Sequence, residues 1–246
     1  MIDVDLLQST WRAATEHGDQ LAEHFYARLF LAHPELRALF PADMTEQRKK
    51  LAQTLTMVVR GARNLEAVAP TLQRLGRDHR GFGARPEHFR HVGTALLETL
   101  AHFLDDQWTP EVAATWSEAY EAVWRAMVDA AGAAERAGQP AVWDGTITAV
   151  QPSHRDRTVI LDINVSDYPV RSGQLVALAL PDTPSCRITA TPVDVTRAVV
   201  VVHLDVDPGD PVALRYAALQ AGDHVHLGAP VDPVEPLEQG GPDGRP

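Results

Sequence analysis

The sequence has little of what marks secreted, membrane-spanning or nucleic-acid-binding proteins. One cysteine, Cys186, excludes an internal disulfide framework and fits a reducing compartment. No apolar run approaches the length needed to span a bilayer. The formal net charge of -11 argues against a nucleic-acid surface, because that partner requires a clustered basic face. We therefore expect neither a membrane nor a nucleic acid as partner.

The first eight residues are acidic and lack a basic patch followed by an apolar core, so we expect no signal peptide. Together with the single cysteine, this start predicts a cytoplasmic protein. The 246 residues, 45% of them hydrophobic, are enough to bury a sizeable core, and this length allows one or two domains.

The residue pattern of the chain changes near Gly138 to Pro140, which divides the chain into two parts. From Asp3 to Arg136 it reads as nearly continuous helix, and its breakers predict about six helices. These breakers are Gly18, Pro34, Pro41, Asn64, Gly81, Gly83, Pro86 and Pro110. We predict an all-helical domain over residues 1–137.

After the boundary the pattern changes to short, β-branched or alternating runs separated by Pro, Gly and Asp. The runs are Thr146 to Gln151, Thr158 to Val165, Gln174 to Leu180, Arg187 to Val193, Ala198 to Asp205 and His224 to Leu227. Six short strands with turns predict a small antiparallel β-barrel over residues 141–230. The Pro- and Gly-rich residues 231–246 predict a disordered tail.

His79 is the most informative residue of the helical part. Leu72, Leu75 and His79 have the spacing i, i+3 and i+7, which aims an imidazole into the interior from the last turn of an apolar stripe. Such a histidine is either a metal ligand or a core residue with its hydrogen bonds satisfied, and the spacing alone leaves both open.

Three other side chains stand out on the preceding stripes. Tyr26 shares a face with Ala22, Leu29 and Phe30, and Phe40 ends a short segment between two prolines. Gln47 begins the stripe that continues with Leu51, Leu55, Val58 and Ala62. Taken separately, Tyr26 can be a core aromatic bonded to a carbonyl, and Gln47 a solvated side chain.

This ordered set of Tyr, Phe, Gln and His resembles the globin half of the flavohaemoglobins. The resemblance implies a globin fold, with haem b bound through its iron to His79 and with Phe40 against the haem face. It also implies that Tyr26, Gln47 and Leu51 lie on the distal side, where a hydroxyl or amide donates to bound oxygen. The gases expected as ligands are O2 and NO.

Three short sequence segments of the second part resemble the flavin-binding barrel of the ferredoxin-reductase group. In flavohaemoglobins this barrel follows the globin. The segments are Trp143 to Thr146, Ser172 to Leu175 and Leu219 to Val225. The family's FAD motif, Arg-x-Tyr-Ser, corresponds here to Arg187-Ile-Thr189-Ala. Arg187 is retained and Thr189 offers a hydroxyl, but loss of the aromatic and the serine predicts severely weakened FAD binding.

Two further departures from the family concern the iron and its electrons. Phe89 occupies the position of a Tyr that the family places beside the proximal histidine, and the last helix has Glu135 only as a misplaced candidate for the family's Glu. Loss of these two polar partners predicts that His79 is a more neutral donor to the iron, which suits reversible gas binding. The sequence after Pro230 leaves no room for the family's nicotinamide-binding domain, so we expect electrons from an external reductase.

Two functions follow from the resemblance. The first is a nitric oxide dioxygenase, an oxidoreductase that forms nitrate from NO and O2, with Tyr26 and Gln47 holding the oxygen. The second is a gas sensor or oxygen-storage protein whose altered barrel docks a partner. A globin fold without haem is disfavoured by His79 and Phe40.

Overall fold

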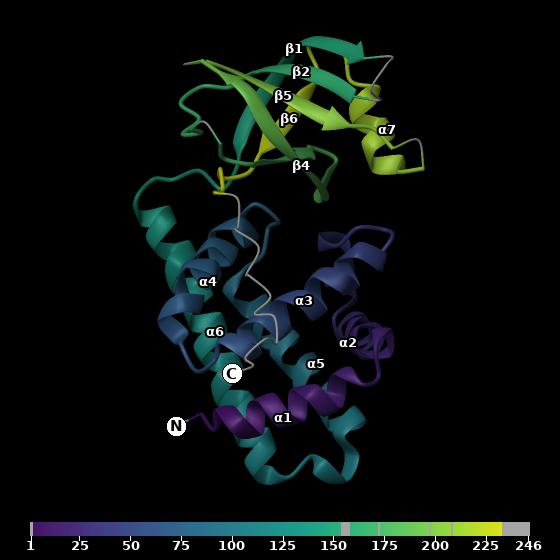
Figure 1. The fold of residues 1–246 in the computed structure, drawn as a ribbon, viewed down its shortest axis with the longest axis vertical. Coiled ribbons are helices and arrows are strands. Elements are labelled where there is room, and N and C mark those ends of the chain that lie inside the picture. Colours follow the sequence, from purple (N-terminus) through teal and green to yellow (C-terminus); the bar gives the residue numbers. More distant parts are fainter. Residues whose placement is uncertain (1, 154–157, 172, 197, 208, 233–246) are drawn as a thin grey trace, which may run out of the picture. The chain divides into compact units, whose positions relative to one another are not determined.

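A computed structural model describes residues 2–153, 158–171, 173–196, 198–207 and 209–232 of the chain. It divides into two compact units with the boundary between Ala141 and Val142. The first unit is helical and the second is built around a β-barrel (Figure 1). None of the helices among the described residues is both long and apolar enough to cross a membrane.

The helices of the first unit begin and end at the breakers that the sequence predicts. Their bounds are α1 Val4–Thr15, α2 Asp19–Ala32, the 3-10 segment η1 Pro34–Leu39, α3 Thr45–Gly61, α4 Leu65–Arg80, α5 Pro86–Leu104, the 3-10 segment η2 Asp105–Gln107 and α6 Pro110–Arg136. Pro34, Pro86 and Pro110 occupy first helical positions, where a missing N–H costs nothing. Asp3 and Thr109 cap α1 and α6 by accepting from Leu6 and Val112 backbone N–H groups.

Two separate apolar clusters fill the helical unit. The larger joins α1, α2, α3, α5 and α6 and contains Tyr26 and Trp116, with Phe40 and Leu51 packed against it. The smaller joins α4 and α6 around Leu72 and Met127, with Leu75 and Phe89 at its margin. The predicted distal residues thus belong to one cluster, and the residues around His79 belong to the other.

Helices α4 and α6 lie side by side (Figure 1). A Cβ added to Gly76 would lie 2.1 Å from the Met127 carbonyl oxygen and 2.8 Å from its Cα atom. Only glycine permits this approach of two helix backbones, one turn before His79.

The second unit confirms the predicted barrel. Its strands are β1 Trp143–Ser153, β2 Thr158–Asn164, β3 Val176–Leu180, β4 Thr183–Val195, β5 Val199–Asp205 and β6 His224–Leu227. They close in the order β1-β2-β5-β4-β3-β6. Strand β1 pairs antiparallel with β2 and β6, and β5 does so with β2 and β4. Alternate residues such as Leu161, Ile163, Val200 and Val202 fill the interior.

The sequence prediction missed one helix in this unit, α7, over Pro211–Ala217. Asp210 caps it by accepting from the Val212 backbone N–H, and Pro211 is its first residue. Tyr216 of α7 is fully buried in the barrel core and donates a 2.8 Å hydrogen bond to the Leu178 carbonyl. This Asp-Pro pair was the signal available in the sequence.

The first two residues of the predicted tail, Val231 and Asp232, contact the barrel. Val231 forms an antiparallel bridge with Leu175, and the Asp232 carboxylate accepts from Gln174 Nε2 at 3.0 Å. Backbone pairing of this kind offsets the entropy that favours a disordered tail. The rest of the predicted tail, 233–246, lies outside the described residues, as does Ser172 of the quoted barrel segment.

Candidate functional site

Tyr26 and Gln47 meet although 21 residues separate them. Gln47 Nε2, at the beginning of α3, donates a 3.2 Å hydrogen bond to the Tyr26 hydroxyl oxygen in α2. Because that bond uses a lone pair of the oxygen, the hydroxyl keeps its own proton for another acceptor. The pair is therefore a hydrogen-bond donor whose orientation is fixed by a second side chain.

Burial keeps Tyr26 protonated. Its side chain belongs to the core, with 5% of the residue exposed. Loss of water around the ring raises the pKa of Tyr26 to about 12, and the hydrogen bond from Gln47 offsets part of that rise. At physiological pH the group is thus a neutral hydroxyl that can donate.

Aromatic rings surround this hydroxyl. Phe40, the residue that follows η1, packs edge-on against Tyr26 and Phe30 at ring-centre distances of 5.5 and 5.2 Å. Phe25 makes an edge contact with Tyr26 at 4.9 Å. The structure therefore brings together three of the predicted residues, Tyr26, Phe40 and Gln47, in an apolar setting that strengthens a polar contact.

His79 lies in the last turn of α4, as the stripe predicts. Its Nδ1 is 2.6 Å from the Leu75 carbonyl oxygen, one turn earlier in the same helix. A carbonyl only accepts, so Nδ1 carries the proton and the lone pair of the neutral ring is on Nε2. Histidines that bind metals typically donate their other ring nitrogen to such an acceptor, which fixes the tautomer and the ring orientation.

Phe89 of α5 packs against His79, with ring centres 5.9 Å apart. Behind it, Tyr120 of α6 donates a 2.5 Å hydrogen bond to the Phe89 carbonyl oxygen. The Tyr120 ring passes so close to Gly93 that an added Cβ would lie 2.4 Å from Cε1. Tyr120 and Phe82, whose ring meets that of His79 edge-on at 5.9 Å, were missed in the sequence, since neither stands apart from other aromatics there.

Burial raises the pKa of Tyr120 well above its ordinary value, so this hydroxyl too stays protonated. Glu135, the weak candidate for a partner of His79, is exposed on α6. His79 Nδ1 contacts the neutral backbone carbonyl of Leu75.

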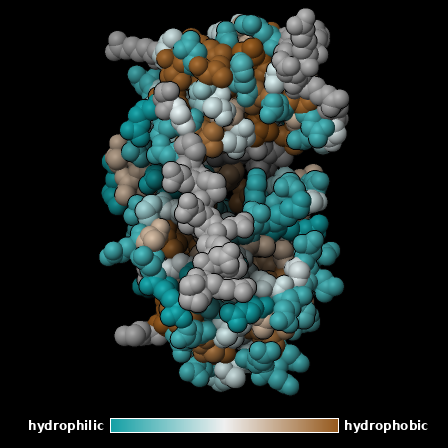
Figure 2. Space-filling model, viewed as in Figure 1, coloured by the Kyte–Doolittle hydropathy of each residue, from teal (hydrophilic) through white to brown (hydrophobic). Residues whose placement is uncertain are grey.

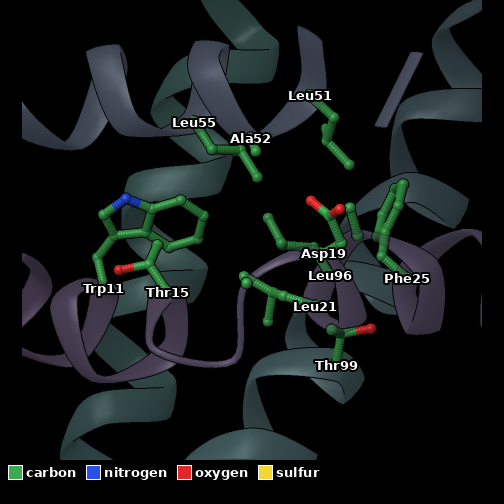
Figure 3. Close-up of a pocket in the computed structure, with 12 residues that line it drawn as sticks. Trp11, Thr15, Asp19, Leu21, Phe25, Leu51, Ala52, Leu55, Leu96 and Thr99 are labelled. Atoms are coloured by element: carbon green, nitrogen blue, oxygen red, sulfur yellow. The ribbon is translucent and has the colours of Figure 1, made fainter. Parts of the chain in front are cut away.

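A cavity of about 200 Å³ is lined by residues of α1, α2, α3 and α5 (Figure 3). Its wall is mostly apolar and includes Trp11, Leu21, Phe25, Leu51 and Leu55. Leu51 is the one predicted site residue in this wall, and Phe25 connects the cavity to Tyr26 through their edge contact. The cavity offers space for a small apolar molecule, and Tyr26 itself is not part of its wall.

The predicted flavin residues lie in β4 of the barrel. Ala190 points inward and is buried, whereas Thr189 and Thr191 are exposed on the outer face. The side chain of Arg187 lies outside the described residues. His224 and His226 of β6 face outward, and His226 Nε2 lies 3.2 Å from the Asp144 carboxylate. Within the described ranges there is no group of three or more His, Cys, Asp or Glu side chains arranged to hold a metal ion.

Comparison with known proteins defines the class of the helical unit. Residues 23–127 match the sequence profile of the Globin family. This range runs from α2 into α6 and includes every predicted residue of the helical site. The helical unit is therefore a globin domain.

Curated proteins that match part of the chain include flavohemoproteins. A flavohemoprotein of Bacillus subtilis (strain 168) is 32% identical over 130 residues, covering 51% of this chain and 32% of the relative. One of Rhodopirellula baltica (strain DSM 10527 / NCIMB 13988 / SH1) is 27% identical over 183 residues, covering 69% and 45%. The chain thus spans less than half the length of these relatives.

A solved structure shares this two-domain fold. The flavohemoglobin from Malassezia yamatoensis, determined with bound FAD and heme, superimposes with a TM-score of 0.72 at 17% identity. The match covers 94% of this chain and 64% of that chain. It confirms the expected globin fold followed by a barrel of the same type.

Proposed function

We propose that this protein binds haem b in the globin domain and uses it as a nitric oxide dioxygenase. The observation that carries the proposal is the hydrogen bond from Gln47 to Tyr26, because it leaves the Tyr26 proton for a ligand in an apolar pocket. His79 supports the proposal from the other apolar cluster, since its Nδ1–H is committed to Leu75 and its lone pair is on Nε2. The donor set fits haem.

When bound, haem would be held by His79 and would supply an iron that binds a diatomic gas and gives up one electron for each nitrate made from NO and O2. The Tyr26 hydroxyl donates to the developing negative charge on the gas, with its direction set by Gln47. A hydrogen bond of this kind is worth about 1 to 3 kcal/mol. Phe40 and Leu51 pack around the group and exclude water.

The activity needs an electron from outside the globin domain. We propose a separate reductase as its source. Outward-facing Thr189 and inward-facing Ala190 replace the aromatic and the serine of the flavin motif in β4, so we do not expect the barrel to bind FAD tightly. A titration tests this expectation: quenching of FAD fluorescence at micromolar protein would contradict it.

Continuous NO consumption tests the proposed enzyme. Purified holoprotein is mixed with NO, O2 and an added reductase, and nitrate is measured over many turnovers. We expect sustained nitrate formation that Tyr26→Phe slows. Absence of a Soret band after reconstitution would contradict haem binding itself.

One observation favours a second candidate, a gas sensor or store. The acceptor for His79 is the neutral carbonyl of Leu75, and its ring neighbour is Phe89. A histidine whose Nδ1–H donates to a neutral carbonyl gives less electron density to a metal than one bonded to a carboxylate, which suits reversible binding. A single stoichiometric reaction with NO, with no further consumption when reductase is added, would favour this function, with the barrel as a docking module.

A further inference from the structure

One segment of this negatively charged protein is basic. Ten of the 22 Lys and Arg residues, but five of the 33 Asp and Glu residues, lie within residues 43–91. That segment has a net charge of +5, so the rest of the chain carries -16. The ten cations are Arg48, Lys49, Lys50, Arg60, Arg63, Arg74, Arg77, Arg80, Arg85 and Arg90. We call this set the basic face.

Seven of these ten cations form no ion pair with another described residue. Lys49 pairs with Glu46 at 2.7 Å, Arg85 pairs with Glu87 at 3.2 Å, and Arg63 pairs with Asp5. For the other seven, no carboxylate of the described residues lies within the 4.0 Å of an ion pair. Lys50 and Arg90 are among those seven and are exposed to water. The segment therefore presents net positive charge to solvent.

The same elements carry the proposed haem residues. Helix α3 holds Gln47 and Leu51, α4 holds His79, and α5 holds Phe89. Lys50 directly precedes Leu51, and Arg90 directly follows Phe89. The side chains of consecutive residues in a helix point about 100° apart. Leu51 and Phe89 are thus more buried than the exposed cations beside them, whereas Lys50 lies one helical turn from Gln47. Hydrophilic residues cover most of the visible face of the helical unit (Figure 2).

We infer that the basic face docks an acidic protein that carries one electron at a time. This inference rests on the proposed haem function, which needs one electron per turnover from a separate donor. In the step, the reduced carrier loses one electron and the ferric haem iron gains it, with no atom transferred. Opposite charges steer such encounters and raise their rate, and electron-transfer interfaces are small enough for three helix surfaces to supply one.

A long polyanion is the less favoured partner. A nucleic acid longer than the basic face would run beside a remainder that carries -16. Repulsion there would offset the phosphate contacts. A compact acidic protein contacts only the basic face and so avoids this repulsion.

Charge reversal tests the inference. The variant Lys50→Glu/Arg90→Glu is compared with unmodified protein and with Arg12→Glu, whose exposed cation lies in α1 outside the basic face. Reduction of the ferric holoprotein by a reduced plant-type ferredoxin, an acidic one-electron carrier, is followed by stopped-flow absorbance. We expect the double variant to react roughly tenfold more slowly at low salt, with the difference lost at about 0.5 M salt. Arg12→Glu should change the rate by less than about twofold.

A binding measurement separates this inference from the haem proposal. Oxidised ferredoxin is titrated into each protein by calorimetry, with and without haem. If the protein takes up no haem but still binds ferredoxin through Lys50 and Arg90, the haem proposal fails and the docking inference stands. Equal affinities for the double variant and Arg12→Glu would overturn the docking inference. So would tighter binding of a DNA duplex than of ferredoxin.

Discussion

Gln47 Nε2 and the Tyr26 hydroxyl oxygen are joined by a 3.2 Å hydrogen bond that connects the first turn of α3 to the middle of α2. The bond fixes the direction of the only proton that Tyr26 can donate. Two helices must therefore keep their relative position for the hydroxyl to face a ligand. The same contact links the fold of the globin domain to its proposed chemistry.

Removing that hydroxyl should speed oxygen release. In Tyr26→Phe the ring packing stays, but the donor to the bound gas is lost, which costs about 1 to 2 kcal/mol. We expect the O2 dissociation rate of the reduced holoprotein to rise roughly tenfold. Flash photolysis or stopped-flow mixing measures it. Tyr168→Phe in the barrel loses a bond to the Gly228 carbonyl and is the matched control, with an unchanged rate. Equal rates for the two variants would remove Tyr26 from the ligand site.

Removing the imidazole of His79 should abolish stable haem binding. His79→Ala takes away the proposed axial nitrogen while leaving the apolar stripe of α4 intact. We expect loss of the Soret band on purification and its partial return when imidazole is added. His203→Ala, at an exposed position on β5, is the control and should keep full haem content. A normal spectrum for His79→Ala without imidazole would identify another ligand.

Close packing at Gly76 should be intolerant of a single added carbon. In Gly76→Ala the new Cβ meets the backbone of Met127, which moves only if α4 and α6 separate. We expect the free energy of unfolding to fall by about 2 kcal/mol in a urea titration. Gly132→Ala is matched to it, because the Cβ there meets only the flexible end of Arg136 at 3.2 Å. A helix gains up to about 1 kcal/mol from that change. Equal effects of both substitutions would contradict the backbone clash.

The sequence predicted the parts of the site that lie on one element and missed those that depend on two. His79 was identifiable because the period of α4 alone aims it inward. The pairing of Tyr26 with Gln47 follows from no local pattern, since it depends on how α2 crosses α3. Tyr120 was missed for the same reason, as its role comes from the glycine at position 93 of another helix. Helix α7 is too short for periodicity to reveal it, and only Asp210-Pro211 signals its start.

Helices α2 and α5 share a pair of stacked histidines. His24 of α2 and His102 of α5 have nearly parallel rings 4.5 Å apart, and His24 Nδ1 lies 3.1 Å from the Thr99 hydroxyl. Burial, then His102 and Arg28, lower the pKa of His24 below its ordinary value of 6.5, against a smaller opposing effect of Glu98. His24 therefore binds a proton less readily in the folded protein than in the unfolded chain.

The stability of the globin domain should therefore fall in mild acid. His24 binds its proton near pH 6.5 in the unfolded chain but only at lower pH in the folded one. The free energy of unfolding is unaffected by this group above that range and decreases as pH falls through it. We expect a lower melting midpoint at about pH 5.5 than at about pH 7. His102→Gln removes the like charge and should reduce this loss without abolishing it, because burial of His24 persists. His203→Gln should leave the loss unchanged, and an equal loss in all three proteins would rule out the stacked pair as its source.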